Sequence, residues 1–400
     1  MAFLCGKENN LTILSMTKIN NLSMKIFYDE NMPFAKEFFG DLGELSPFVG
    51  RELTSEQAKN ADVLLVRSIT KVNQGLLGNN SCCQFVGTAT IGVDHIDQNY
   101  LSKRNITFTS APGCNAISVA EYVISSLIVL AERYLIDIFS LTIGIVGGGN
   151  TGTRLSEKLS ALGINYLLCD PLLEAEQKNN VVDKRQYSSL EQVLACDVIS
   201  LHVPITNNGE YPTFHLLDAE RLSQFNENQI LINACRGEVI DNQALLEIKQ
   251  QGHGVKLVLD VWENEPNILH DLVEYTEICS AHIAGYSLEG KARGTEMLYQ
   301  ALCKQLEIPV EKQLSDFLPS ASITEVEINQ PFEQILLNQL VKMVYDVRRD
   351  DGIFRQTILS HGFDHIRKTY PARREFSSVK VTMTNQAKSD VPHHLGFLNQ

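Results

Sequence analysis

The chain has 400 residues, of which 44% are hydrophobic and 20% charged, a composition that is ordinary for a globular protein of two or three domains. Its formal net charge of −14 argues against a nucleic acid or an anionic membrane surface as partner. The nine cysteines form no Cys-x-x-Cys pair and no Cys/His cluster with zinc spacing, so we expect reduced thiols, no bound metal and a cytoplasmic location.

At the start of the chain, residues 1–23 lack the apolar run and cleavage site of a signal peptide, and we expect a disordered extension there. From Met24 to Thr109, short β-branched runs alternate with helical patterns, which is typical of βαβ units in a parallel sheet. The predicted strands are residues 25–28, 63–66, 85–87 and 106–109, and the predicted helices include residues 34–42 and 55–60.

An amphipathic helix is predicted next, over residues 118–134. Its most apolar window, residues 122–131, is too short to cross a membrane and is interrupted by Ser125 and Ser126. No membrane anchor is therefore predicted.

A glycine-rich turn follows the predicted strand at residues 143–146, with Gly147, Gly149 and Gly152 in the pattern Gly-x-Gly-x-x-Gly. In a dinucleotide site the first glycine permits the tight turn, the second leaves room for the pyrophosphate, and the third lets the helix pack close to the strand. A helical pattern and a further strand at residues 166–169 supply the context that the motif requires. A turn with a purely structural role is the alternative.

Asp170 ends that further strand and indicates which dinucleotide binds. A carboxylate can accept hydrogen bonds from both ribose hydroxyls of NAD, whereas it would repel the 2′-phosphate of NADP. Pro171 follows where an enzyme specific for NADP would often have arginine. We therefore predict NAD as the cofactor.

A second βαβ series continues from the glycine turn. Its predicted strands are residues 166–169, 198–201, 229–233, 255–259 and 277–279. A later helical stretch, residues 290–306, is long enough to pack back on the first domain. That domain is then discontinuous, and the cleft between the two domains is the expected site.

The predicted fold class is α/β, with two doubly wound, Rossmann-like parallel-sheet domains and a smaller C-terminal α+β domain. Residues 24–117 and 285–307 are assigned to a substrate domain, residues 118–284 to the NAD-binding domain, and residues 308–400 to the C-terminal domain. Within the last of these, residues 331–347 are predicted to be helical and residues 346–351 form a charged run.

Three polar residues, Arg236, Glu265 and His282, each follow a predicted strand of the second series. The carboxyl ends of parallel strands meet at the edge where the cofactor lies, so these side chains can converge although they are far apart in sequence. Taken singly, each has an ordinary structural explanation: a helix cap for the arginine, a solvated turn for the glutamate, and a hydrogen-bonded surface residue for the histidine.

On these motifs the chain resembles the D-isomer-specific 2-hydroxyacid dehydrogenases, whose Arg, Glu and His fall in matching segments. The resemblance runs from Met24 nearly to the C-terminus, and the segments that carry it are residues 29–33, 66–70, 85–90, 111–116, 233–237, 282–291 and 344–351. It implies oxidation of a small phosphorylated four-carbon hydroxy acid with NAD. It also implies that the C-terminal domain makes a homodimer.

The resemblance and the chemistry of alcohol oxidation together give three catalytic roles. His282 would accept the hydroxyl proton, because an imidazole with an ordinary pKa of roughly 6.5 suits a general base. Glu265 would accept a hydrogen bond from the other ring nitrogen and fix the tautomer. Arg236 would bind the substrate carboxylate and polarise the developing carbonyl with its fork of donors.

Further contacts follow from the glycine motif and from the resemblance. The substrate would meet Ser68, Thr90 and Tyr286, with Arg67, Lys291 and Arg293 as sources of positive charge. The residues expected to contact NAD are Gly147, Gly149, Asn150, Thr151, Gly152, Asp170, Val203, Ala234, Cys235, Arg236, Asp260 and Gly285.

Two positions depart from the family pattern. Val203 stands where threonine is usual, and Asn264 stands where glycine is usual between two glutamates, which would alter the turn that aims Glu265. Another 2-hydroxy acid, such as 3-phosphoglycerate, is an alternative substrate. A non-catalytic scaffold that senses NAD is a second alternative, which the trio of Arg, Glu and His disfavours.

Overall fold

A computed structural model describes residues 24–177, 183–384 and 389–399, so the expected extension at residues 1–23 lies outside the described part of the chain. The described residues divide into two compact units. Unit 1 comprises residues up to 88 together with 94–109 and 298–310, and unit 2 comprises residues 89–93, 110–297 and 311–400.

Unit 1 is built on a five-stranded parallel sheet with the order β2-β1-β3-β4-β5. Its strands are β1 (Lys25–Asp29), β2 (Glu44–Phe48), β3 (Val63–Val66), β4 (Phe85–Thr88) and β5 (Thr107–Thr109). Its helices are α1 (Ala35–Phe39), α2 (Ser55–Ala58), α3 (Gln74–Leu77), α4 (Gln98–Lys103) and the second half of α11 (Leu288–Gln305). Strands β3 and β4 are buried on both faces, as expected for the centre of a parallel sheet.

Strand β2 is absent from the sequence-based prediction, and its position in the sheet explains why. It pairs only with β1, and Pro47 lies opposite Tyr28 in that pairing. Proline normally argues against a strand because it cannot donate to a ladder, but an edge strand needs donors on one side only. An edge strand therefore tolerates Pro47, and this proline is the reason why the sequence did not predict β2.

Unit 2 contains a six-stranded parallel sheet with the order β11-β10-β9-β8-β6-β7. Its strands are β6 (Thr142–Val146), β7 (Asn165–Cys169), β8 (Val198–Leu201), β9 (Ile230–Asn233), β10 (Lys256–Leu259) and β11 (Ile278–Cys279). Its helices include α5 (Ala116–Tyr134), α6 (Asn150–Leu162), α7 (Pro171–Gln177), α8 (Leu190–Leu194), α9 (Ala219–Ser223) and α10 (Asn242–Gln250). The chain leaves β6 toward β7 on one side and returns to β8 on the other, so the glycine turn opens at the switch point of the sheet.

The long helix α5 is buried from Val119 to Ala131 within the main hydrophobic cluster of unit 2. Helices alternate with the strands of both parallel sheets along the chain, which confirms the predicted α/β class. In the described ranges, no helix combines the length and the apolar character needed to cross a bilayer.

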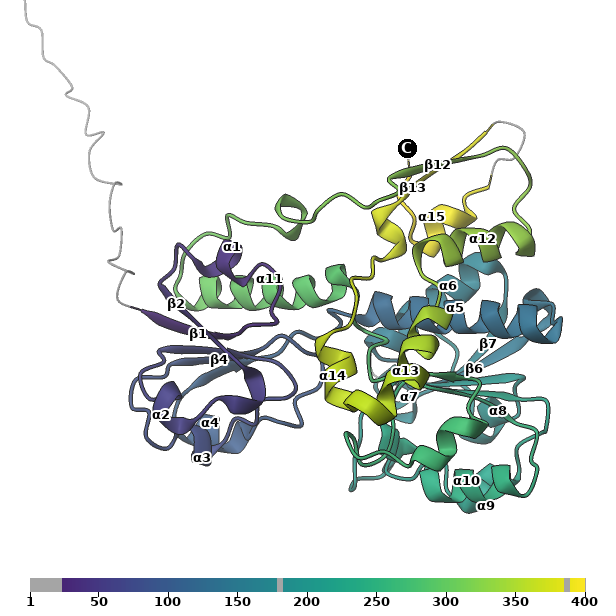
Figure 1. The fold of residues 1–400 in the computed structure, drawn as a ribbon, viewed down its shortest axis with the longest axis horizontal. Coiled ribbons are helices and arrows are strands. Elements are labelled where there is room, and N and C mark those ends of the chain that lie inside the picture. Colours follow the sequence, from purple (N-terminus) through teal and green to yellow (C-terminus); the bar gives the residue numbers. More distant parts are fainter. Residues whose placement is uncertain (1–23, 178–182, 385–388, 400) are drawn as a thin grey trace, which may run out of the picture. The chain divides into compact units, whose positions relative to one another are not determined.

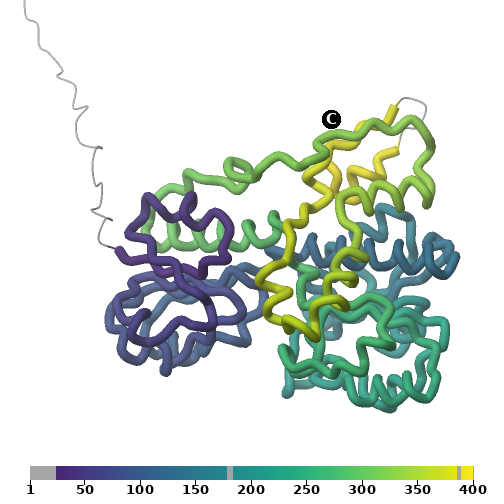
Figure 2. The backbone as a smooth tube through the Cα atoms, viewed as in Figure 1, coloured from purple at the N-terminus to yellow at the C-terminus, as the bar shows by residue number. Residues whose placement is uncertain are grey.

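The C-terminal segment of unit 2 contributes a two-stranded parallel sheet and four helices (Figure 1). The elements are β12 (Glu325–Ile328), β13 (Lys380–Met383), α12 (Gln334–Val344), α13 (Arg348–His361), α14 (Phe363–Lys368) and α15 (Val391–Leu395). Helix α12 packs on α5, α15 packs on α6, and α13 packs beside β11. Figure 2 shows this late part of the chain running back alongside the six-stranded sheet and its helices.

The chain passes from unit 1 to unit 2 between residues 109 and 110, and returns to unit 1 between residues 297 and 298. The sequence suggested these boundaries at 117/118 and 284/285. Hydrogen bonds explain the difference at the second boundary. Ser118 at the start of α5 and Ser287 just before α11 both donate to Glu375 of the C-terminal segment. These contacts tie the first half of α11 to unit 2.

Candidate active site

The glycine turn after β6 has the shape that a dinucleotide requires. Gly147 has a φ of +100°, and a Cβ there would lie 2.5 Å from the carbonyl oxygen of His202. A Cβ on Gly152 would lie 1.9 Å from the carbonyl oxygen of Gly147, so helix and turn touch through bare backbone. A Cβ on Gly149, in contrast, would meet no heavy atom of the described residues within 4 Å. The turn is therefore tight where it packs and open where a pyrophosphate would lie.

Asn150 and Thr151 open α6, whose first turn contains no acidic residue. Their backbone N–H groups lie at the positive end of the helix, which favours a bound phosphate. Asp170 accepts hydrogen bonds from the N–H groups of Gly148 (2.9 Å) and Leu173 (3.1 Å). Each carboxylate oxygen has a second lone pair for a ribose hydroxyl. These residues fit NAD.

Arg185 is a member of this site that the sequence did not reveal. Its Nη1 donates to the carbonyl oxygen of Gly148 at 2.6 Å and to the hydroxyl of Thr153 at 3.0 Å. Its charge is balanced by Asp183, with an N···O distance of 2.7 Å. The arginine thus braces the glycine turn, and no motif marks it because it lies far along the chain.

The expected catalytic residues follow three neighbouring strands. In the sheet register, Asn233 at the end of β9 lies opposite Leu259 of β10, which lies opposite Cys279 of β11. Arg236 follows the first of these strands and His282 the last. A Cβ on Gly237, next to Arg236, would lie 2.0 Å from the backbone of Trp262, so the loops after β9 and β10 are in direct contact.

Glu265 and His282 form a hydrogen-bonded pair. The Nδ1 of His282 lies 2.8 Å from Oε2 of Glu265, while Oε1 accepts the N–H of Trp262 at 2.9 Å. Burial alone would raise the pKa of Glu265, but His282, Trp262 and the charge of Arg367 together hold it below its usual value. Because an ionised carboxylate only accepts, Nδ1 carries the hydrogen and Nε2 is the basic atom of the neutral ring.

Asp260 holds the turn that carries His282. Its buried carboxylate accepts from Ser280 (2.6 Å) and from the N–H groups of Ile283 (2.8 Å) and Ala284 (3.0 Å). Burial raises the pKa of this carboxyl, and the hydrogen bonds oppose that effect. A contact of Asp260 with the nicotinamide side of NAD stays a prediction.

The departure at Asn264 has a structural explanation. Its φ of +63° lies in the left-handed region, which glycine adopts freely and which asparagine tolerates better than most other residues. The turn between Glu263 and Glu265 is therefore kept, and Glu265 reaches His282.

The remaining expected cofactor residues lie around the same edge of the sheet. Val203 approaches the glycine turn, with its Cγ1 3.0 Å from a Cβ placed on Gly147. Ala234 is half-buried and Cys235 is buried, and burial raises the pKa of the Cys235 thiol to about 11. Gly285 packs against the side chain of Asn115.

The expected substrate residues fall in both units. Ser68 is exposed just after β3 in unit 1, beside an open hollow of about 440 Å³ that Ile69 and Thr70 line. Thr90 belongs to unit 2 and donates its hydroxyl to the carbonyl oxygen of Gly92 at 2.9 Å. Tyr286 lies in unit 2 on the turn after His282, closed by a hydrogen bond from its N–H to Ile283 (2.8 Å).

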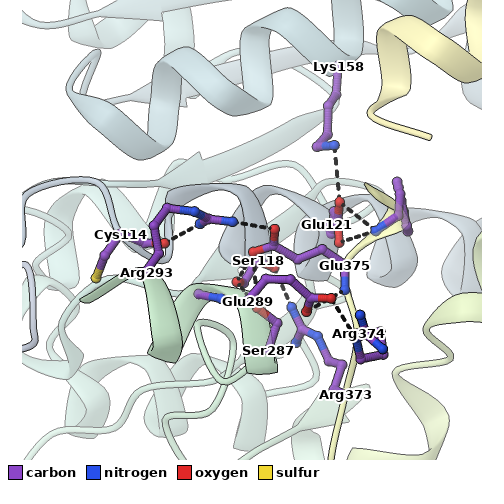
Figure 3. Close-up of polar contacts among 12 residues, drawn as sticks. Cys114, Ser118, Glu121, Lys158, Ser287, Glu289, Arg293, Arg373, Arg374 and Glu375 are labelled. Carbon is purple, nitrogen blue, oxygen red and sulfur yellow. Dashed lines mark hydrogen bonds and ion pairs between the residues drawn. The ribbon is translucent and has the colours of Figure 1, made fainter. Parts of the chain in front are cut away.

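A buried polar network connects the C-terminal segment to this site (Figure 3). Glu375 is fully buried and accepts hydrogen bonds from Ser118 (2.8 Å), Ser287 (3.0 Å) and Arg293 (2.6 Å). Arg373 donates to the carbonyl oxygen of Ala284 at 3.0 Å, two residues after His282. Arg293, an expected source of positive charge for the substrate, thus forms an ion pair with Glu375 instead.

One group of possible metal ligands occurs in the described residues. His215, Asp241 and Glu263 have ligand atoms within 4.8 Å of one another. The imidazole lies 2.8 Å from Glu263 and 3.6 Å from Asp241, and these carboxylates also accept the N–H groups of Asn242 and Ala244. A histidine held between two hydrogen-bonded carboxylates accounts for this cluster.

Comparisons with known proteins agree with this geometry. Residues 129–284 match the family described as "D-isomer specific 2-hydroxyacid dehydrogenase, NAD binding domain", and residues 317–396 match a domain of unknown function, DUF3410. An erythronate-4-phosphate dehydrogenase of Colwellia psychrerythraea is 65% identical over 390 residues, covering 94% of this chain and 99% of the relative. One of Tolumonas auensis is 52% identical over 375 residues, with the same coverage.

Solved structures are similar over a shorter part of the chain. A D-lactate dehydrogenase from Aquifex aeolicus, complexed with NAD and lactic acid, has a TM-score of 0.57 and 25% identity, covering 70% of this chain and 95% of that chain. The NAD⁺-bound 3-phosphoglycerate dehydrogenase of Entamoeba histolytica has a TM-score of 0.60 and 22% identity, covering 74% and 100%. Both support the predicted fold, and the NAD-binding family supports the predicted cofactor. The chain therefore belongs to the erythronate-4-phosphate dehydrogenases, NAD-dependent oxidoreductases of the D-isomer-specific 2-hydroxyacid dehydrogenase family.

Proposed function

We propose that this chain oxidises 4-phospho-D-erythronate to (R)-3-hydroxy-2-oxo-4-phosphooxybutanoate with NAD, in the biosynthesis of pyridoxal 5′-phosphate. The names of the relatives support this substrate. The observation that carries the proposal is the 2.8 Å pair of Glu265 and His282, at the carboxyl edge of the sheet that also bears the glycine turn. A protein that only sensed NAD would not need this base.

His282 acts as the base in this reaction. Its Nε2 accepts the proton of the C2 hydroxyl, and the electron pair of that O–H bond becomes the second bond of the carbonyl. Glu265 stabilises the imidazolium that results, because the carboxylate stays ionised next to Nδ1. Bound NAD supplies the acceptor for the hydride that leaves C2.

Other residues bind and orient the reactants. Arg236 holds the substrate carboxylate, with the backbone fixed by the contact of Gly237 with Trp262. Asp170 accepts the ribose hydroxyls, and the N–H groups around Asn150 hold the pyrophosphate. Ser68, Thr90 and Tyr286 complete the proposed substrate contacts.

The proposal is tested by steady-state kinetics on the purified chain. We expect a higher kcat/KM for 4-phospho-D-erythronate than for 3-phosphoglycerate, and we expect His282→Asn to lower kcat by a factor of about a thousand or more. Asparagine is chosen because His282 has a φ of +55°, which asparagine tolerates. His361→Asn, on an exposed position of α13, is the matched control. Preference for 3-phosphoglycerate, or full turnover by His282→Asn, would refute the proposal.

We further propose that the enzyme is a cytoplasmic homodimer assembled through residues 308–400. The cysteines of the described residues are all free thiols, which suits a reducing compartment. Exposed apolar side chains on the C-terminal segment, such as Ile335 and Leu359, suit an interface.

A further inference from the structure

The C-terminal segment places one arginine beside the proposed catalytic pair. Arg367 lies on α14, and its Nη2 donates to the hydroxyl of Tyr286 at 2.9 Å. Its charge lowers the pKa of Glu265, the partner of His282. Arg367 therefore contacts an expected substrate residue and acts electrostatically on the partner of the expected base, although it is 102 positions beyond Glu265 in the sequence.

The guanidinium of Arg367 has positive charge and donors that the protein leaves available. Its Nε is buried and makes no hydrogen bond within the described residues. The partner at its Nη2 is a neutral phenol, and the carboxylates of Glu265 and Asp364 raise the pKa of Arg367 through their charges. Buried donors in proteins are normally hydrogen-bonded, so an arginine whose Nε lacks an acceptor is suited to an anionic ligand.

A second cation lies on the same tyrosine. The Nζ of Lys291 lies 5.4 Å from the ring centroid of Tyr286, and the guanidinium carbon of Arg367 lies 5.6 Å from it. Tyr370 packs edge-on against the same ring at 5.9 Å. Two positive charges thus lie near the ring of Tyr286, and one of them, Arg367, also donates to its hydroxyl. Positive charge together with hydrogen-bond donors is what a phosphate group binds.

Helix α14 is held firmly enough to deliver this side chain. Phe363 and Ile366 are buried in the hydrophobic cluster that also contains Trp262, whose N–H binds Glu265. After the helix, Arg373 and Glu375 enter the buried network of Figure 3. The helix is therefore fixed both by its own apolar face and by the segment that follows it.

We propose that Arg367, together with Lys291 and the hydroxyl of Tyr286, binds the phosphate of the substrate. The inference rests on the proposed function for the identity of that substrate. It gives the C-terminal segment, which matches a separate domain family over residues 317–396, a direct part in recognising a phosphorylated acid. Arg236 then binds the carboxylate at one end of the molecule, and Arg367 binds the phosphate at the other.

The test compares Arg367→Gln with Lys368→Gln, which removes the same charge from the next, exposed position of α14. In Arg367→Gln we expect KM for 4-phospho-D-erythronate to rise about a hundredfold with kcat changed less than about threefold, the order expected for one lost charge-assisted hydrogen-bond partner. We also expect inorganic phosphate, a competitive inhibitor of the wild type, to lose potency by a similar factor. Lys368→Gln should behave as the wild type in both measurements.

Three results would overturn the inference: no competitive inhibition of the wild type by phosphate, an unchanged KM in Arg367→Gln, or a fall in kcat with unchanged phosphate inhibition. The last result would mean that Arg367 acts through Glu265 and His282 instead. Equal unfolding midpoints of the two variants in urea exclude a loss of fold. If the wild type oxidises a different 2-hydroxy acid, phosphate inhibition of that reaction still tests the anion site separately from the proposed function.

Discussion

His282 combines an unfavourable backbone conformation with a well-supported side chain. A φ of +55° is uncommon for residues other than glycine, and such strain costs about 1–3 kcal/mol. Three hydrogen bonds from Ser280, Ile283 and Ala284 to Asp260 oppose that cost by fixing the flanking backbone. The strained turn directs the imidazole toward Glu265, so the strained residue is the one that the proposed chemistry uses.

We expect a second histidine, His202, to make the stability of unit 2 depend on pH. Its Nε2 lies 2.8 Å from the hydroxyl of Ser200, and Nδ1 is buried without a hydrogen-bond partner among the described residues. Burial lowers the pKa of His202 to about 3, compared with 6.5 ordinarily. Between these values the unfolded chain binds one more proton than the folded chain, so stability falls as the pH falls.

We expect His202→Gln to reduce this dependence, because glutamine keeps a polar partner for Ser200 and cannot titrate. Between pH 6 and pH 4, the free energy of unfolding of the wild type should fall more steeply than that of the variant, by about 1.4 kcal/mol per pH unit. Urea unfolding at several pH values measures both slopes. The difference at pH 7.5, above the ordinary pKa, gives the effect of substitution alone. Parallel slopes would show that His202 is accessible to protons in the folded state.

Among the elements, the segment between α14 and β13 has the most unusual polar packing. It contributes Arg373, Arg374 and Glu375 to one buried network with residues of α5, α6 and α11. Arg374 pairs with Glu289 at 2.5 Å, and Lys158 pairs with the buried Glu121 at 3.4 Å. Such networks contribute less net stability than apolar packing, but they are costly to break at one partner.

Glu375→Ala should therefore destabilise unit 2 strongly. The substitution leaves the guanidinium of Arg293 and the hydroxyls of Ser118 and Ser287 without their shared acceptor. We expect a loss of about 3 kcal/mol in the free energy of unfolding, measured in urea. The control is Arg348→Ala, which breaks an exposed ion pair with Asp346 and should cost less than about 1 kcal/mol. Equal losses in the two variants would show that the network is not specifically stabilising.

These elements also show what the sequence could and could not predict. Strands such as β3 and β8 are short, mostly apolar and buried runs, and their positions were predicted to the residue. The glycine turn and Asp170 were predictable because a local motif carries them. Contacts such as that of Glu375 with Ser118 join residues 257 positions apart, and nothing in either segment indicates its partner. The contact of Arg367 with Tyr286 was not predicted for the same reason, because the two residues are 81 positions apart.

At the scale of the whole molecule, the C-terminal segment has both buried and exposed apolar side chains. Leu337 and Val341 of α12 are fully buried and belong to the main hydrophobic cluster of unit 2 with α5. Other apolar side chains lie in water, with Ile335 of α12 at 72% and Leu359 of α13 at 81% exposure. Large apolar side chains exposed on two helices of one segment are typical of a surface that another chain covers.

The expected partner is a second copy of this chain. We expect the wild type to sediment at twice its chain mass of 44.7 kDa, and the double variant Ile335→Glu/Leu359→Glu to sediment at the mass of one chain. Burying two carboxylates in an apolar interface costs several kcal/mol, which is enough to separate the copies at micromolar concentration. Leu135→Glu, at a position 93% exposed outside the segment, should leave the dimer intact. A monomeric wild type, or a dimeric double variant, would place the interface elsewhere or remove it.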